Sequence, residues 1–444
     1  MKQLSGLDAT FLYMEAGGNQ FGHVSSLSVY EPPDRPGYDP LGEWRAAIEK
    51  RLHLLEPLRR RLVEVPLNLD HPFWIEDPNF DLDFHVRHTA VPPPGSDEQL
   101  SEIISRIIGH QWKPERVPSD MEVLQRAALS LARKPARGIL LTARTLRELG
   151  QATSNPTVVA AANQIRGSLR GPLGSILNIG RNRDAEPDTP PVALPSLRAP
   201  RTSFNATITP HRKFAFRSTS LDAVKAAKNA LGATVNDVVM AVCAGGLRTY
   251  LESRGELPEI PLVAMVPVSI RTGEETEKWT NRVSAIIAEI PTHIADPIER
   301  VRAVHESMVT SKQLFDAIPE STLTEFSSFS PPQLFTRAMR MATRFQLGNR
   351  FQMPVNVTIS NVPGPRQPLY SAGSKLLHYF PVSTIAEGQG LNITVQSYLD
   401  TLDIGLVSCR ELVPDVWDLT DMIVEDLELL CKAAGVDVPV TLVR

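Results

Sequence analysis

The sequence has few of the features that mark an extracellular, membrane-spanning or nucleic-acid-binding protein. It contains only three cysteines in 444 residues, too scattered for a disulfide framework or a cysteine metal site. Its longest apolar runs fall short of the roughly 18–20 residues that cross a bilayer. The formal net charge of −4 leaves no excess of Lys and Arg to neutralise nucleic-acid phosphates. We therefore expect a soluble protein with no membrane span, no metal site and no nucleic-acid partner.

The first 18 residues carry acids at Asp8 and Glu15 and have no continuous apolar core. We therefore expect no signal peptide and a cytoplasmic location. Cys243, Cys409 and Cys431 are expected to be core residues, since two of them fall inside apolar patterns.

A chain of 444 residues is too long for one ordinary core, because domains typically contain roughly 100–200 residues. The stretch Arg181–Pro200 holds five prolines among charged residues, which is typical of a stiff linker. The sequence therefore predicts an N-terminal lobe at 1–180, a linker at 181–203 and a C-terminal lobe at 204–444.

The clearest strand pattern lies near the C-terminus, where apolar Val355, Val357 and Ile359 alternate with polar residues. Further strands are predicted at 376–385, 391–399 and 402–409, and we expect consecutive strands to form one sheet. Residues 362–365 (VPGP) suit a type II turn, with Pro363 presetting φ and Gly364 at positive φ.

Elsewhere helical and strand patterns alternate, which indicates a mixed α/β fold with a strand-poor first lobe. Thr234 and Asp237 have the spacing of a capping box that opens a helix. Helices are predicted at 41–55, 97–110, 121–132, 136–149, 156–169, 220–231, 234–250, 297–315, 322–345 and 415–434. Strands are predicted at 23–30, 214–216, 262–270 and 282–290, and the stretch 73–86 has a mixed pattern.

Several blocks along nearly the whole chain resemble the bacterial wax ester synthase/diacylglycerol acyltransferase family, especially actinobacterial triacylglycerol synthases. The matching blocks are LDATFL at 7–12, HV at 23–24, FDLDFHVR at 80–87, PG at 94–95, PHR at 210–212, GATVNDVV at 232–239, PVS at 267–269, NR at 281–282, NVPGP at 361–365, LNIT at 391–394 and SY at 397–398.

This resemblance implies two acyl-CoA-dependent acyltransferase-like lobes, each a mixed sheet flanked by helices, which enclose a tunnel. The implied substrates are a fatty acyl-CoA and a diacylglycerol or long-chain (fatty) alcohol, giving triacylglycerol or wax ester. Acyl-CoA would be consumed as a substrate, and no further cofactor is implied. Such a protein would meet its substrates at a membrane or lipid-droplet surface as a peripheral protein. The sequence does not indicate an oligomeric state.

The family's catalytic signature, HHxxxDG, is absent. It should follow the helix that ends near His110, but the chain runs from His110 and Gln111 straight to Trp112, and none of its ten histidines adjoins another. No catalytic residue is therefore assigned. Two functions remain open: an O-acyltransferase with a substitute base, or an inactive paralogue that binds acyl chains or partners an active relative. Loss of the motif by itself predicts little or no acyl transfer.

Six residues are candidate contacts to substrate, and each has a plainer structural interpretation. Asn236 and Asp237 are the right types to cap a helix. Two asparagines beside the PGP turn could equally stabilise that turn, and His110 is interpreted as a helix C-cap. The six candidates are His23, His211, Asn236, Asp237, Asn361 and Asn392.

Overall fold

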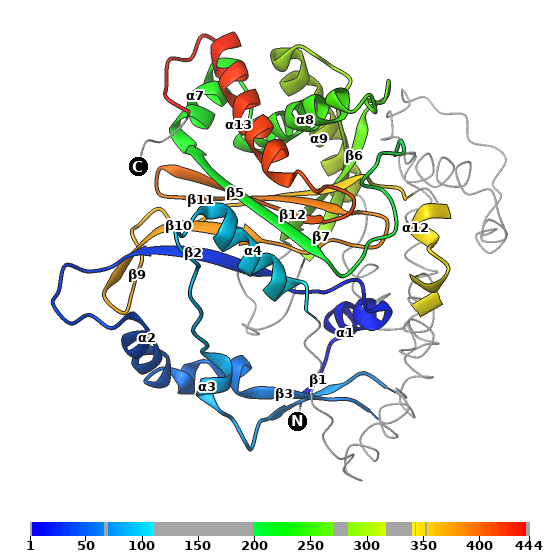
Figure 1. The fold of residues 1–444 in the computed structure, drawn as a ribbon. Coiled ribbons are helices and arrows are strands. Elements are labelled where there is room, and N and C mark those ends of the chain that lie inside the picture. Colours follow the sequence, from blue (N-terminus) through cyan, green and yellow to red (C-terminus); the bar gives the residue numbers. More distant parts are fainter. Residues whose placement is uncertain are drawn as a thin grey trace.

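A six-stranded mixed sheet forms the centre of the fold (Figure 1). The computed structural model describes residues 2–65, 70–110, 199–269, 283–316, 340–341, 343–350 and 353–440. Along the sheet the strand order is β5, β12, β11, β8, β6, β7. The strands are β5 (Arg212–Ser220), β6 (Leu262–Ser269), β7 (Val283–Ile290), β8 (Val357–Val362), β11 (Leu391–Tyr398) and β12 (Thr401–Cys409). β8 runs parallel to its neighbours β11 and β6, and the other pairs are antiparallel. The predicted mixed α/β class is confirmed.

Four helices lie together over one face of this sheet (Figure 1). They are α7 (Leu221–Leu231), α8 (Val235–Ser253), α9 (Pro297–Asp316) and α13 (Val416–Ala433). A Cβ atom at Gly245 of α8 would overlap the carboxylate of Asp426, and one at Gly246 would lie 2.5 Å from Ile423 Cγ1. Helix α8 therefore packs closely against α13 through these two glycines.

The opposite face of the sheet is covered by α4 (Asp97–Ile108) and by a second sheet of order β2-β10-β9. These strands are β2 (Ser25–Glu31), β9 (Tyr370–Ser371) and β10 (Ser374–Val382). Phe216 of β5 and Phe380 of β10 join the layers, with ring centroids 4.7 Å apart. The predicted strand at 376–385 exists, but its expected place in one sheet with its sequence neighbours is wrong.

Contacts with β12 explain why β10 crosses that strand rather than pairing beside it. Fully buried Asp403 accepts a hydrogen bond from the Tyr379 N–H at 2.7 Å, and its Oδ1 lies 3.1 Å from His378 Nδ1. A Cβ at Gly405 would overlap the Pro381 carbonyl oxygen. A period of two in the sequence shows which face of a strand is buried but not which strand lies next to it.

The N-terminal residues add a small third sheet of order β1-β4-β3 and several short helices. These elements are β1 (Lys2–Gln3), α1 (Gly6–Met14), η1 (Glu15–Gly17), α2 (Pro40–Glu49), η2 (Leu52–Leu54), η3 (Glu56–Arg59), β3 (Arg60–Val63), β4 (Phe73–Glu76) and α3 (Leu82–His85). Near residue 350 the described part of the chain also contains the short helix α12 (Leu347–Arg350).

Helix ends follow the local signals in the sequence closely. Ser96 and Gln99 form a capping box at α4, Thr234 and Asp237 form another at α8, and Gly232 ends α7 at a φ of 65°. The predicted helix at 41–55 is too long, because α2 ends at Glu49 and the chain continues in 3₁₀ turns. Leu52 and Leu55 are three residues apart, and this spacing of apolar residues suits a 3₁₀ turn as well as an α-helix.

The type II turn predicted at 362–365 is wrong, because Gly364 is not among the glycines with positive φ. The glycine is needed for a different reason: a Cβ at Gly364 would overlap the Ser397 carbonyl oxygen.

Other predictions fall partly or wholly outside the described residues. These are the helices at 121–132, 136–149 and 156–169, most of the helix at 322–345, and most of the linker at 181–203. The lobe boundaries therefore stay predictions. The three cysteines are buried and free, as expected.

Within the described ranges, no single helix has both the length and the apolar composition of a membrane span. The bent pair α7 and α8, at 103° to each other, meets those criteria together, and both helices contribute to the core described above.

Candidate functional site

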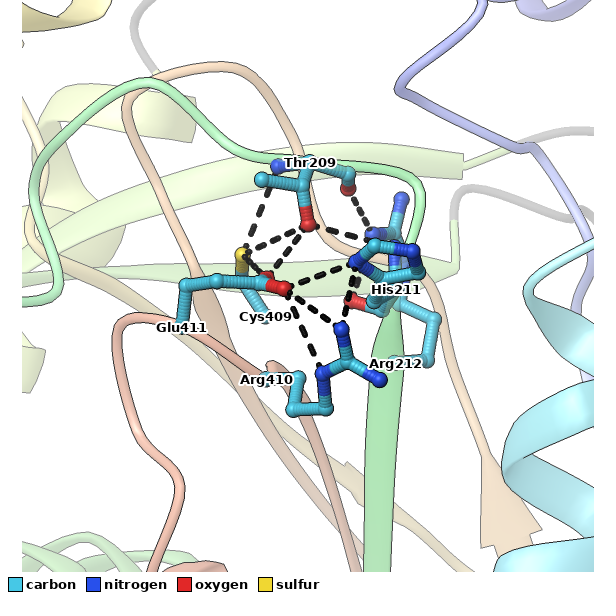
Figure 2. Close-up of polar contacts among 6 residues, drawn as sticks. All are labelled: Thr209, His211, Arg212, Cys409, Arg410 and Glu411. Atoms are coloured by element: carbon cyan, nitrogen blue, oxygen red, sulfur yellow. Dashed lines mark hydrogen bonds and ion pairs between the residues drawn. The ribbon is translucent and has the colours of Figure 1, made fainter.

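A group of polar side chains lies at one corner of the central sheet (Figure 2). His211 immediately precedes β5 and Glu411 follows β12. These strands are antiparallel, with Arg212 opposite Cys409, so the start of β5 meets the end of β12. His211 Nδ1 lies 2.7 Å from Glu411 Oε1. We call the six residues drawn in Figure 2 the sheet corner: Thr209, His211, Arg212, Cys409, Arg410 and Glu411.

Glu411 is surrounded by donors. Its carboxylate accepts hydrogen bonds from the Thr209 hydroxyl and from Arg410 Nη2 at 3.0 Å, and Cys409 Sγ lies 3.5 Å away (Figure 2). Partial burial raises the pKa of Glu411, but the hydrogen bonds from Thr209 and His211 outweigh burial and hold the pKa at about 2. The side chain is therefore a carboxylate at every ordinary pH.

This carboxylate fixes the orientation of the His211 ring. A carboxylate partner requires the proton on Nδ1, which leaves the lone pair on Nε2. Arg410 Nη2, which can only donate, lies 2.9 Å from the same Nδ1, so the two partners favour opposite tautomers, and the proton on Nδ1 follows from the closer contact with the carboxylate. The His211 side chain is 52% exposed. The arrangement matches the orienting acid and base of a hydroxyl-activating pair.

Arg212 connects the sheet corner to the N-terminal part of the chain. Its side chain is 6% exposed, and Nη2 donates to the Asn19 carbonyl oxygen at 2.6 Å. Burial lowers the pKa of Arg212 to about 10, so the guanidinium stays charged at neutral pH. It lies over the Phe21 ring, which stacks on His23 with centroids 5.7 Å apart. The structure thus brings His23 and His211 to the same corner.

His23 has one ring nitrogen that is not hydrogen-bonded. Its Nδ1 is buried and has no hydrogen-bond partner among the residues that the structure describes. The end of α4 lies beside the same corner, since a Cβ at Gly109 would be 3.2 Å from the Pro210 carbonyl oxygen. His110 is exposed, and its Nδ1 lies 2.9 Å from the Arg106 carbonyl oxygen, in agreement with a helix-end role.

Asp237 lies away from the corner and caps α8. Its Oδ2 accepts a hydrogen bond from the Thr234 N–H at 2.9 Å, and the Asp237 N–H donates to the Thr234 hydroxyl. His305 of α9 also contacts Oδ2 through Nδ1, at 2.8 Å. Asn236 is partly buried in the same helical turn. The capping interpretation of this motif is confirmed, and the contact with His305 was not predicted.

The two remaining asparagines differ in position. Asn392 of β11 is buried, donates to the Thr384 carbonyl oxygen at 2.9 Å and accepts from the Thr394 hydroxyl. The Thr384 hydroxyl in turn donates to the carbonyl oxygen of Phe21, the residue whose ring lies under Arg212. Asn392 is therefore linked to the sheet corner through Thr384 and Phe21. Asn361 is partly buried on β8, opposite Val395 of β11.

Sequence reasoning missed Thr209, Arg410 and Glu411. They have no motif of their own and reach His211 only through the β5–β12 pairing. Across the described part of the chain, no three His, Cys, Asp or Glu side chains gather in a way that could hold a metal ion.

Family models match most of the chain. The model described as "Wax ester synthase/diacylglycerol acyltransferase catalytic domain" matches residues 4–124 and 114–239, and the "WS/DGAT C-terminal domain" model matches 279–431. The two catalytic-domain matches overlap at 114–124, shortly after α4.

Named relatives and a solved structure agree with these models. A putative diacylglycerol O-acyltransferase of Mycobacterium tuberculosis is 31% identical over 98% of this chain and 91% of its own length. The O-acyltransferase WSD of Acinetobacter baylyi is 30% identical over 97% of both chains. The wax ester synthase/diacylglycerol acyltransferase of Marinobacter aquaeolei VT8 has a TM-score of 0.65 and 28% identity, covering 98% of this chain and all of its own.

Proposed function

Because the chain belongs to the wax ester synthase/diacylglycerol acyltransferase family, we propose that it transfers a fatty acyl group from acyl-CoA to the hydroxyl of an acceptor lipid. With diacylglycerol the product is triacylglycerol, and with a long-chain alcohol it is a wax ester. The observation that carries this proposal is the extent of the family match, which runs from residue 4 to 431 with one interruption.

In the described part of the chain, His211 has the best geometry for the base. Nε2 takes the proton of the acceptor hydroxyl while its oxygen attacks the thioester carbonyl carbon. The new ester bond forms, the carbon–sulfur bond breaks, and the proton passes from the imidazolium to the CoA thiolate. Glu411 would hold the ring in place and stabilise its transient positive charge. Acyl-CoA is consumed as a substrate in this scheme.

A second candidate function rests on one observation in the sequence. The ten histidines include no adjacent pair, so the HHxxxDG signature of the family is absent. A chain without its base and without a substitute would still bind acyl chains or partner an active relative. The names of the relatives give no support to this candidate.

The test uses purified full-length protein with labelled palmitoyl-CoA and either diolein or hexadecanol. We expect labelled triacylglycerol or wax ester together with stoichiometric free CoA. Intact mass confirms that the chain has the printed sequence. Binding of palmitoyl-CoA without ester formation with either acceptor would contradict the proposal and favour the second candidate.

A further inference from the structure

The sheet corner differs from an enclosed acyl-transfer site because its polar side chains are open to solvent. The side chains of His211, Arg410 and Glu411 are 52%, 50% and 38% exposed. An enzyme that transfers an acyl group to an alcohol has to keep water away from the reacting carbonyl, because water is itself a nucleophile. At an exposed base, water therefore competes with the acceptor lipid for the acyl group.

The contacts of His211 suit water as well as an alcohol. Glu411 Oε1 lies 2.7 Å from Nδ1 and orients the ring, so Nε2 carries the lone pair that accepts a proton. The Thr209 hydroxyl donates to the other carboxylate oxygen, Oε2, so Glu411 is held on both sides. A general base acts on any hydroxyl within hydrogen-bond reach of its lone pair. The pair of His211 and Glu411 is therefore formed before any acceptor lipid binds.

Arg410 places a positive charge beside this base. Attack on a thioester carbonyl puts negative charge on its oxygen, and a hydrogen-bond donor next to that oxygen stabilises the charge. Arg410 donates to Glu411 Oε1 from Nε at 3.3 Å and from Nη2 at 3.0 Å. Its Nη1 has no partner among the six residues drawn in Figure 2. The guanidinium is thus fixed through two nitrogens, and the third is left as a donor for a substrate oxygen.

Apolar surface for an acyl chain lies on two segments that meet at the corner. The N-terminal segment places the Phe21 ring under Arg212, and exposed Val24 follows three residues later. The other segment is the last turn of α4, which contains exposed Ile107 and leads to Gly109 beside the Pro210 carbonyl oxygen. A long acyl chain whose thioester lies at His211 would therefore have apolar side chains within reach.

We propose that the sheet corner also hydrolyses fatty acyl-CoA, with water in place of the acceptor lipid. His211 Nε2 takes a proton from water while the water oxygen attacks the thioester carbonyl carbon, and Arg410 Nη1 stabilises the negative carbonyl oxygen. The carbon–oxygen bond forms, the carbon–sulfur bond breaks, and the imidazolium gives the proton to the CoA thiolate. The products are the fatty acid and free CoA, and the reaction needs no oxidant or further reactant.

Hydrolysis rests on the base of the proposed function, but it gives a different product, so the two activities can be told apart. Ester without fatty acid would leave acyl transfer standing and contradict hydrolysis. Fatty acid without ester, in the presence of an acceptor lipid, would support hydrolysis and contradict acyl transfer. Neither product would contradict both.

The experiment incubates purified full-length protein with labelled palmitoyl-CoA and no alcohol, and measures palmitate and free CoA. We expect equal amounts of the two products, formed faster than without protein. A second reaction adds diolein, and there the CoA released by transfer should match the triacylglycerol while the remaining CoA matches the palmitate. His211→Ala should lower kcat for hydrolysis by about 10²–10⁴-fold, the usual effect of losing a general base. Losing an oxyanion donor costs about 10²–10³-fold in an enclosed site, so for half-exposed Arg410 we expect a loss of at least about 10-fold in Arg410→Gln.

Two exposed residues outside the corner provide matched controls. His293→Ala removes an imidazole and Arg366→Gln removes a guanidinium in the turn after β8, and both variants should hydrolyse palmitoyl-CoA like the wild type. Every variant is purified in the same way, so a contaminating thioesterase would act equally in all of them, and circular dichroism checks their folding. Palmitate formation at the wild-type rate in His211→Ala or in Arg410→Gln, or no palmitate beyond the protein-free reaction, would overturn the proposal.

Discussion

Glu411 is the residue on which the orientation of the proposed base depends. It links the loop before β5 to the end of β12 through contacts with Thr209, His211 and Arg410. These contacts stabilise the ionised form of the Glu411 carboxylate. Their contribution to the free energy of unfolding is therefore lost when acid protonates that group.

We predict that Glu411→Gln lowers stability at neutral pH by less than about 1 kcal/mol, because the group is partly exposed and its interactions are screened. The folded-state pKa of about 2 lies below the ordinary value of 4.5. The stabilisation is therefore fully present above pH 4.5 and is lost as pH falls towards 2. Urea unfolding of both proteins across this range measures the difference.

Glu425→Gln, at an exposed position of α13, serves as the control for this experiment. A stability difference for Glu411→Gln that stays constant from neutral pH down to pH 2 would show that its carboxylate is not held ionised as described.

At the scale of elements, a buried ion pair joins three of the four helices above the sheet. Arg300 of α9 donates from Nη2 to both carboxylate oxygens of Asp426 on α13, at 2.6 and 2.9 Å, and from Nε to the Ala241 carbonyl oxygen of α8. Both charged side chains are almost fully buried. Removing one member leaves the other charge buried without its partner.

We predict that Arg300→Met destabilises the protein by about 3–5 kcal/mol, whereas the double variant Arg300→Met/Asp426→Leu loses clearly less. Chemical denaturation of the single and double variants measures the coupling. Asp222→Asn, which removes the exposed pair with Lys225, is the control and should cost less than about 1 kcal/mol. Additive losses in the double variant would mean that the two side chains do not act as a pair.

Helices and strands with a capping motif or a clear apolar period could be predicted from the sequence. The elements that pack beside them in space could not. The capping box of Thr234 and Asp237 is formed by residues within one turn, so α8 began where expected. The strand β10 was also expected, yet its pairing with β2 depends on residues more than 300 positions away. Its crossing over β12 depends on the buried Asp403 and on Gly405, which have no distinguishing pattern in the sequence.

At the scale of the whole molecule, the sheet corner is assembled from distant parts of the chain. Asn19, His211 and Glu411 meet only because β5 pairs with β12 and Arg212 reaches the N-terminal segment. The sequence therefore suggested His23 and His211 as separate candidates and gave no sign of Glu411. The family resemblance, by contrast, depends on short blocks along the chain, and the family models confirm it.

Acyl transfer with His211 as the base is tested most directly by one comparison of rates. We predict that His211→Ala lowers kcat for acyl transfer from palmitoyl-CoA to diolein by about 10²–10⁴-fold, the usual effect of losing a general base, with little change in KM. His293→Ala, at an exposed histidine away from the corner, should retain wild-type turnover. Wild-type turnover in both variants, or no turnover in the unaltered chain, would contradict the account.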